Sequence, residues 1–150
     1  MPRAIVEIET GCAPTEALDY LADFSRAPEW DPSVAAARRL DDGPVRRGSR
    51  FELTVKAAGR TTPLVYELVT TEPDTIVLLS RSRRLESRDT ITVAPTTVGA
   101  RVRYEAELRG LGWSRVANPV LAIVFRKLAA RAAEGLRGRL NEISSARGAA

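Results

Sequence analysis

The feature that most constrains the fold is a run of short alternating segments followed by one long amphipathic segment. Between residues 34 and 109, apolar and polar side chains alternate in stretches that are typical of strands with one buried face. Turn signals separate these stretches at Asp41-Asp42-Gly43-Pro44, Ala58-Gly59, Glu72-Pro73-Asp74, Arg81–Arg84 and Pro95–Gly99. Six consecutive strands joined by short turns predict an antiparallel meander.

Two shorter patterns precede the meander. Residues 3–9 alternate in polarity and predict a further strand. Pro14 and Glu16 suit the first turn of a short helix, because proline is compatible with the first helical position and a carboxylate is stabilised by the helix dipole there. Pro28 and Pro32 limit any second helix to about one turn.

The last pattern predicts one long helix from about residue 114 to 143. Pro119 lies in its first turns, so the helix begins there or is kinked there. A helix of this length needs a sheet or a partner to cover its apolar stripe, and the order strand, helix, strands, helix predicts an α+β fold. The stripe consists of side chains spaced by three and four residues, namely Val120, Leu121, Val124, Leu128, Ala132, Leu136, Leu140 and Ile143.

The residue types that the chain lacks exclude several kinds of catalytic and metal site. A chain of 150 residues with 44% hydrophobic and 28% charged residues fits one folded domain, which we expect to span residues 1–150. There is no histidine, which excludes Ser-His-Asp and Cys-His machinery and most transition-metal sites. Cys12 is the one cysteine, which excludes an internal disulfide. We therefore expect neither a metal nor a cofactor.

The sequence also bears on localisation. No apolar run approaches the roughly 18 residues that a membrane span requires, so we expect no integral membrane segment. The N-terminal residues lead directly into a strand pattern without the apolar region of a signal peptide. We expect a cytoplasmic protein.

Positive charge is concentrated in the last helix. From Ser114 onward seven basic and two acidic residues give a net charge of +5, within a total of +4 for the chain. Such a face is either simply solvated or contacts an acidic membrane or another polyanion, and both interpretations stay open. Helix-turn-helix spacing and interleaved aromatic residues are missing, so we expect no nucleic-acid partner. A monomer and a homodimer both remain open.

The turn positions predict which side chains share a face of the sheet. A turn centred on Ala58-Gly59 places Leu53 opposite Leu64 and Phe51 opposite Tyr66. A turn centred on Pro73-Asp74 places Leu68 opposite Leu79, and continued pairing places Asp89 opposite Leu79 and Tyr104. The predicted interior face then contains Phe51, Leu53, Val55, Leu64, Tyr66, Leu68, Val77, Leu79, Ile91, Val102 and Tyr104.

Three polar residues fall on this apolar face. They are Asp89, Ser87 and Arg81, and a buried carboxylate such as that of Asp89 needs partners because an unpaired one costs several kcal/mol. Tyr104 and Arg81 are the expected partners. Asp89 is then either anchored structurally by Tyr104 or directed at a ligand in a cavity, since a few convergent polar groups in an apolar interior are typical of small-molecule pockets.

Several segments resemble a known superfamily. Residues 17–24 (ALDYLADF) followed by 27–32 (APEWDP) resemble the N-terminal part of SRPBCC proteins, the START/polyketide cyclase/dehydrase and lipid transport superfamily. Residues 47–51 (RGSRF) are similar to the glycine-led third segment of these proteins, and residues 89–93 (DTITV) and 99–104 (GARVRY) to their sixth and seventh strands. The resemblance covers nearly the whole chain.

The resemblance implies a helix-grip fold. In such a fold a curved, seven-stranded antiparallel sheet wraps around a long C-terminal helix, and two short helices lie between strands 1 and 2. A cavity lies between sheet and helix. The implied ligand-binding residues are Trp30, Phe51, Leu53, Tyr66, Leu68, Leu79, Asp89, Tyr104, Trp113, Leu121, Val124 and Phe125. For the aromatic ones, packing in the core is an equally open interpretation.

Three functions follow as hypotheses. The first is binding or carriage of a hydrophobic small molecule, lipid-like or polycyclic, without catalysis. The second is a polyketide cyclase, aromatase or dehydratase, in which Asp89, Tyr104, Tyr66 or Arg81 would transfer protons in place of histidine. The third is a module that binds a partner or a membrane surface through its basic C-terminal helix.

Overall fold

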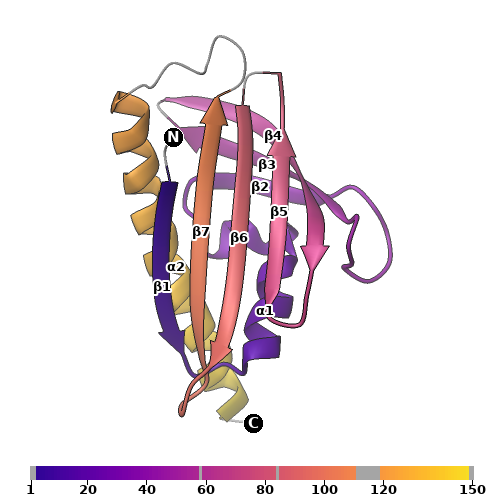
Figure 1. Ribbon diagram of the computed structural model, residues 1–150, viewed down its shortest axis with the longest axis vertical. Helices are drawn as coiled ribbons and strands as arrows, with labels where there is room; N and C mark the ends of the chain where they lie inside the picture. The colour runs from indigo at the N-terminus through magenta and orange to yellow at the C-terminus, as the bar shows by residue number, and fades with distance from the viewer. Residues whose placement is uncertain (1–2, 58, 84, 111–118, 149–150) are drawn as a thin grey trace.

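Seven strands form one antiparallel sheet in the computed structural model, which describes residues 3–57, 59–83, 85–110 and 119–148, with only the backbone for residues 57, 119–125, 147 and 148 (Figure 1). The strand order is β1-β7-β6-β5-β4-β3-β2, so the first strand lies beside the last one. The predicted antiparallel meander is confirmed. The strands are β1 (Arg3–Thr10), β2 (Val34–Arg39), β3 (Arg50–Ala57), β4 (Arg60–Thr71), β5 (Thr75–Arg81), β6 (Leu85–Pro95) and β7 (Ala100–Gly110).

Two short helices connect β1 to β2, as predicted. Helix α1 (Pro14–Ala22) has proline at its N-terminal position and buries its apolar face against β5, β6 and β7. The 3-10 helix η1 (Phe24–Glu29) follows, and the Asp23 side chain caps it by accepting a hydrogen bond from the Ser25 N–H at 3.1 Å. Both helices therefore lie on the inner face of the sheet.

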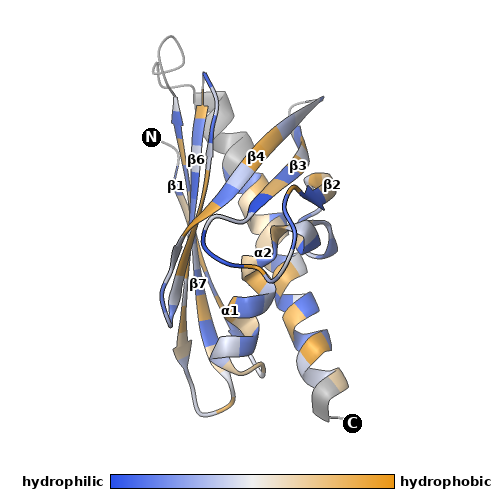
Figure 2. Cartoon of the chain, turned by 90° about the vertical axis from the view of Figure 1, so that its right-hand side faces the viewer, coloured by the Kyte–Doolittle hydropathy of each residue, from blue (hydrophilic) through white to orange (hydrophobic). Residues whose placement is uncertain are grey.

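The long helix α2 (Pro119–Gly148) lies on the same face. It extends beyond the predicted end at residue 143, while the predicted start near residue 114 lies outside the described residues. It packs along β1 and contacts η1, and Figure 2 shows β2, β3 and β4 leaning over the helices. Leu136 and Leu140 of its apolar stripe are fully buried. Among the described residues, no helix is long and apolar enough to cross a membrane.

Helix α2 approaches the η1–β2 connection closely at one glycine. A Cβ atom added at Gly135 would lie 2.0 Å from the carbonyl oxygen of Trp30, which is far inside van der Waals contact. Only a residue without a side chain permits this approach. The contact holds the Trp30 segment against the helix and positions it beside the cavity described below.

The predicted register is confirmed for one hairpin and wrong for the next. Phe51 pairs with Tyr66 and Leu53 with Leu64, as expected. Between β4 and β5 a register shift after Leu68 makes that residue pair with Leu78 instead of Leu79. Such a β-bulge inserts one extra residue in β4. It therefore reverses which side chains of β5 are predicted to face the interior. Leu78 is accordingly fully buried.

The bulge corrects three further predictions. Val77, Leu79 and Arg81 alternate with Ile76, Leu78 and Ser80, so they lie on the opposite face from the one predicted. Leu79 is only half-buried and Arg81 is exposed, whereas Ser80 is buried. Arg81 is therefore not the interior partner of Asp89.

The inward facing of Asp89 and Ser87 is confirmed, although the predicted cross-strand partners of Asp89 are wrong. Asp89 pairs with Leu78 on β5 and with Ala106 on β7. Tyr104 pairs with Ile91, which lies two residues from Asp89 on the same face. Because a two-residue offset preserves the face, Tyr104 still lies diagonally beside Asp89.

Candidate functional site

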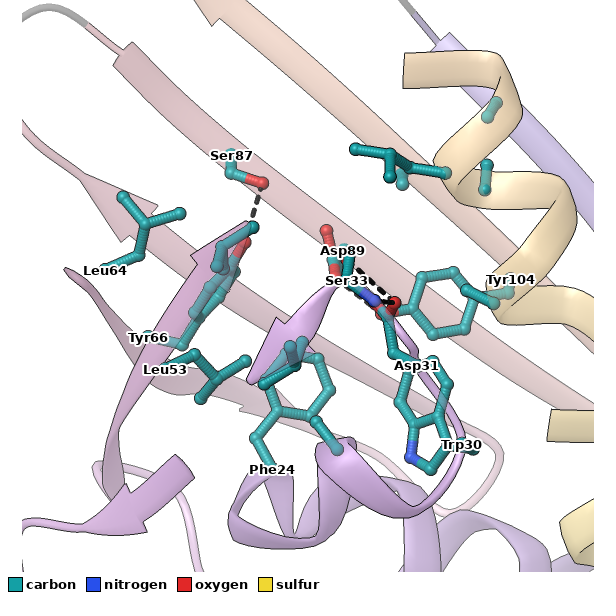
Figure 3. Close-up of a pocket in the computed structure, with 18 of the residues that line it drawn as sticks. Phe24, Trp30, Asp31, Ser33, Leu53, Leu64, Tyr66, Ser87, Asp89 and Tyr104 are labelled. Carbon is teal, nitrogen blue, oxygen red and sulfur yellow. Dashed lines mark hydrogen bonds between the residues drawn. The ribbon is translucent and has the colours of Figure 1, made fainter. Parts of the chain in front are cut away.

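A cavity of about 260 Å³ lies between the inner face of the sheet, η1 and α2. Apolar side chains from nearly every element of the fold form most of its wall, and a small number of polar groups interrupt them (Figure 3). The wall is made by Ala4, Val6, Phe24, Ala27, Trp30, Asp31, Ser33, Val34, Leu53, Val55, Thr62, Leu64, Tyr66, Leu85, Ser87, Asp89, Tyr104, Ala106, Leu108, Leu128, Ala129, Ala132, Ala133 and Leu136.

Two tyrosine hydroxyls bond to polar residues of β6. The Tyr104 hydroxyl on β7 donates to Oδ2 of Asp89 at 2.5 Å, and the Tyr66 hydroxyl on β4 donates to Oγ of Ser87 at 3.0 Å (Figure 3). Asp89 and Ser87 are 8% and 6% exposed. The alternation of β6 directs both side chains inward, because they are two residues apart.

A second carboxyl enters the cavity from the loop before β2. Oδ1 of Asp31 accepts hydrogen bonds from the backbone N–H of Ser33 at 2.9 Å and from its hydroxyl at 2.7 Å. This is a local turn in which an aspartate bonds to the residue two positions ahead. Figure 3 shows Asp31 and Asp89 on the same side of the cavity, near the Tyr104 hydroxyl.

Burial perturbs both carboxyls. Removal from water raises the pKa of Asp89 from 3.8 to about 7; the hydrogen bond from Tyr104 opposes this rise, and the charge of Asp31 adds to it. Burial likewise raises the pKa of Asp31, and the hydrogen bonds from Ser33 oppose it. Asp89 can therefore exchange a proton near neutral pH, which is the range that acid–base chemistry requires.

The tyrosines of the cavity stay neutral. Burial raises the pKa of both Tyr66 and Tyr104 above the ordinary value, and the nearby charge of Asp89 adds to the effect. A neutral phenol keeps its proton and acts as a hydrogen-bond donor. Tyr104 thus holds one oxygen of Asp89 in place.

Aromatic rings pack edge to face along the same wall. The ring centroids of Phe24 and Tyr66 are 5.3 Å apart with an interplanar angle of 69°, and those of Trp30 and Tyr104 are 5.8 Å apart at 64°. Phe24 also contacts Trp30, with centroids 6.3 Å apart. These contacts are in the range preferred by aromatic pairs, and they link η1 to the sheet.

Five of the predicted site residues line the cavity. Trp30, Leu53, Tyr66, Asp89 and Tyr104 contribute to its wall, while a ligand contact for each of them stays a prediction.

The other predicted site residues do not contribute to the described wall. Phe51 and Leu68 are buried in the core behind it, and Leu79 faces away because of the bulge between β4 and β5. Trp113 lies outside the described residues, and the structure does not describe the side chains of Leu121, Val124 and Phe125.

Sequence reasoning missed Asp31, Ser33 and Phe24 as part of the wall. The signal for the first two was an aspartate followed two residues later by serine, which marks a local turn and leaves the carboxyl near Trp30. Phe24 belonged to a short helix whose facing could not be derived from periodicity. Within the described part of the chain, no three Cys, Asp or Glu side chains come together as metal ligands.

Four basic residues of α2 lie outside the cavity. Arg126, Lys127, Arg131 and Arg137 are exposed, as a solvated helix face would be. Contact of this face with an acidic surface stays a prediction.

Comparison with known proteins identifies relatives of this chain. The family model described as "Polyketide cyclase / dehydrase and lipid transport" matches residues 1–141. A search of curated protein sequences finds no significant match.

Solved structures share the fold at low sequence identity. A START superfamily protein from Mycobacterium smegmatis has a TM-score of 0.74 and 15% identity, over 94% of this chain and 97% of that one. The Zhui aromatase/cyclase from Streptomyces sp. R1128 has a TM-score of 0.68 and 12% identity, over 92% of both chains. The major latex-like protein 151 from Panax ginseng has a TM-score of 0.66 and 11% identity, over 92% of this chain and 96% of that one. At these identities the similarity establishes the helix-grip fold alone.

Proposed function

Because the chain belongs to the polyketide cyclase / dehydrase and lipid transport family, we propose that it binds a hydrophobic small molecule, lipid-like or polycyclic, between the sheet and α2. The observation that carries the proposal is the cavity of about 260 Å³, with its apolar wall and few convergent polar groups. This combination is typical of small-molecule sites.

The size of the cavity sets a scale for the ligand. A dry apolar cavity of roughly 150 Å³ accommodates a benzene molecule. A cavity of about 260 Å³ therefore suits a molecule of about two fused rings, or a short branched chain of similar volume. A packed core without such a function would fill a space of this size, since an unfilled cavity lowers stability.

A matched pair of alanines on α2 tests the proposal. Ala132 lines the cavity, whereas Ala130 is exposed. Native mass spectrometry of gently purified protein should show a retained small molecule, and fluorescence titration with an apolar dye should show saturable binding. Ala132→Phe should reduce dye affinity at least about tenfold by occupying the cavity, while Ala130→Phe should leave it unchanged. Equal affinity in the two folded variants would contradict the proposal.

Catalysis in the same cavity is a second candidate, favoured by one observation. Asp89 has a pKa of about 7 and lies in the wall beside Tyr104, so it could take a proton from a substrate and return it. This would suit a cyclase, aromatase or dehydratase, with Tyr66 as a further donor. Arg81 no longer belongs among the candidates because it faces outward.

Asp89→Asn separates the two candidates. For an enzyme, the variant should retain substrate affinity and lose turnover by about 100-fold or more, because general acid–base catalysis contributes that much. For a binding protein, neither the parent nor the variant turns over the ligand. The measurement is product formation by mass spectrometry with a poly-β-ketone analogue, beside dye affinity of both proteins.

A further inference from the structure

The described residues of the cavity wall include acidic groups and no basic ones. Among the described residues that line it, Asp31 and Asp89 are acidic and none is lysine or arginine, and the chain has no histidine. A carboxylate or phosphate group buried there would meet like charges without a compensating cation, which is strongly unfavourable. The described part of the wall therefore offers no counter-charge to a fatty acid or another anionic lipid.

Each of the two carboxyls has one oxygen available for a ligand. Tyr104 binds Oδ2 of Asp89, and Ser33 binds Oδ1 of Asp31 with both its N–H and its hydroxyl. The second oxygen of each carboxyl accepts no hydrogen bond from a described residue. In the described part of the chain, the one fully buried side-chain N or O atom without a partner is Nε of Arg39. The two carboxyl oxygens are therefore not fully buried and remain accessible from the cavity.

Asp89 is the more informative of the two. Its side chain is more than nine-tenths buried, lies in the cavity wall and has no cation beside it in the described residues. In its ionised form, a carboxyl in this position is further stabilised when a positive group approaches its open oxygen. Burial and the charge of Asp31 raise its pKa to about 7, and among the described residues no cation opposes this rise.

Aromatic rings surround the same acidic groups. Trp30 and Tyr104 contact each other edge to face beside Asp89, and Phe24 contacts Tyr66 along the same wall. The faces of aromatic rings attract cations, and desolvation strengthens this attraction. Tyr104 belongs to the aromatic wall and also holds Asp89, so both kinds of attraction meet at one place (Figure 3).

We propose that the cavity selects an apolar or aromatic molecule that carries one protonated amine, with the ammonium group against the open oxygen of Asp89 and the ring system among Phe24, Trp30 and Tyr66. The proposal rests on the ligand-binding function proposed above and names its ligand class. Neutral molecules of the same shape bind more weakly, and anionic ones most weakly.

Three probes with one skeleton test the selectivity. Isothermal titration calorimetry at pH 8 compares 1-naphthylmethylamine, 1-naphthylmethanol and 1-naphthoic acid, which differ in the charge of one substituent. We expect the amine to bind at least about tenfold more tightly than the alcohol, because a charge-assisted hydrogen bond and a cation–π contact are added. The acid should bind at least about tenfold more weakly than the alcohol.

Substitution of Asp89 should remove the preference for the amine over the alcohol without abolishing binding of the alcohol. In Asp89→Asn the amine and the alcohol should bind with affinities within about threefold of each other, and binding of the alcohol then reports that the variant is folded. Asp42→Asn is the matched control, since Asp42 is exposed in the loop between β2 and β3 and its replacement changes the net charge equally. This control should retain the full preference for the amine.

The outcomes separate this proposal from the function on which it rests. If the alcohol binds and the amine binds no more tightly, or if the acid binds as well as the alcohol, the amine selectivity is wrong and ligand binding stands. If Asp89→Asn keeps the preference, the assignment to Asp89 is wrong. If none of the three probes binds to the parent protein while the apolar dye does, the amine selectivity is wrong and ligand binding stands. If neither the probes nor the dye bind, both proposals are contradicted.

Discussion

Ser87 and Asp89 lie two residues apart on β6 and form an internal comparison. Both point into the cavity and both are buried, at 6% and 8% exposure. Each accepts a hydrogen bond from a tyrosine hydroxyl, Ser87 from Tyr66 and Asp89 from Tyr104. They differ in one property, because only the carboxyl can carry a charge.

The difference shows what structural anchoring requires. At Ser87 a neutral hydroxyl and one hydrogen bond satisfy a buried polar position. At Asp89 the same arrangement leaves one oxygen open and shifts the pKa to about 7. Since a serine suffices to anchor a tyrosine in this wall, the carboxyl at Asp89 is better explained by a group that enters the cavity.

The largest expected effect comes from removing the charge. The folded protein holds the Asp89 proton more tightly than the unfolded chain, so its stability falls as pH rises from 3.8 toward 7. Asp89→Asn removes this loss while retaining the shape of the side chain. We compare the free energy of unfolding of the variant with that of the parent at each pH. This difference should shift in favour of the variant by about 3 kcal/mol between pH 5 and pH 8.5. Urea unfolding at the two pH values measures the change.

Ser87→Ala is the control for this experiment. It should lower the free energy of unfolding by about 1 kcal/mol at both pH values, because Tyr66, the partner in the lost hydrogen bond, stays neutral at both. If the free energy of unfolding of Asp89→Asn changed with pH in the same way as that of the parent, the carboxyl of Asp89 would not differ from the hydroxyl of Ser87 in its effect on stability.

The next effect compares the two tyrosines. Tyr104→Phe removes the donor to Asp89, and at pH 8.5, where the carboxyl is ionised, it should cost about 2 kcal/mol of folding free energy. Tyr66→Phe removes the donor to Ser87 and should cost about 1 kcal/mol. At pH 5 the two costs should become similar, since both acceptors are then neutral. Urea unfolding would refute the comparison if Tyr66→Phe were the more damaging change at pH 8.5.

The smallest effect concerns Asp31. Its negative charge contributes to the raised pKa of Asp89, after the larger contribution of burial. Asp31→Asn should therefore lower the pKa of Asp89 by a fraction of a unit and leave it above 3.8. Carboxyl carbon chemical shifts followed by NMR during a pH titration measure this change. Asp42→Asn should leave the titration of Asp89 unaltered, and an equal shift in both variants would assign the effect to net charge.

Local patterns predicted most of the fold. Pro14 at the start of α1 and the pairing of Phe51 with Tyr66 both agree with the structure. These features depend on residues close together in the chain or joined by one short turn. In such cases the period of two and the turn position suffice to define the face.

The misplacement of Leu79 and Arg81 has a different origin. A bulge after Leu68 shifts the register by one residue, and nothing in the local pattern of β4 marks it. The bulge reversed the facing predicted for β5, so one local irregularity moved both residues to the outer face. The facing predicted for β6 was restored because Asp89 pairs with Leu78 and not with Leu79, which is a second difference of one residue. The sequence also did not predict that Asp31 lines the cavity. Its neighbour Trp30 is held beside the cavity by the close approach of Gly135, which is far away in the sequence.

The amino-acid sequence alone determined the order of strands and helices, the α+β class and the absence of histidine-based chemistry, because these follow from periodicity, turn residues and composition. Only the tertiary structure decided that Asp31, Asp89 and four aromatic rings share one cavity without a basic residue among its described wall. The physical reason is that burial and electrostatic interaction depend on distances in space. Segments as far apart as those of Ala4 and Leu136 meet only when the curved sheet folds over the helices.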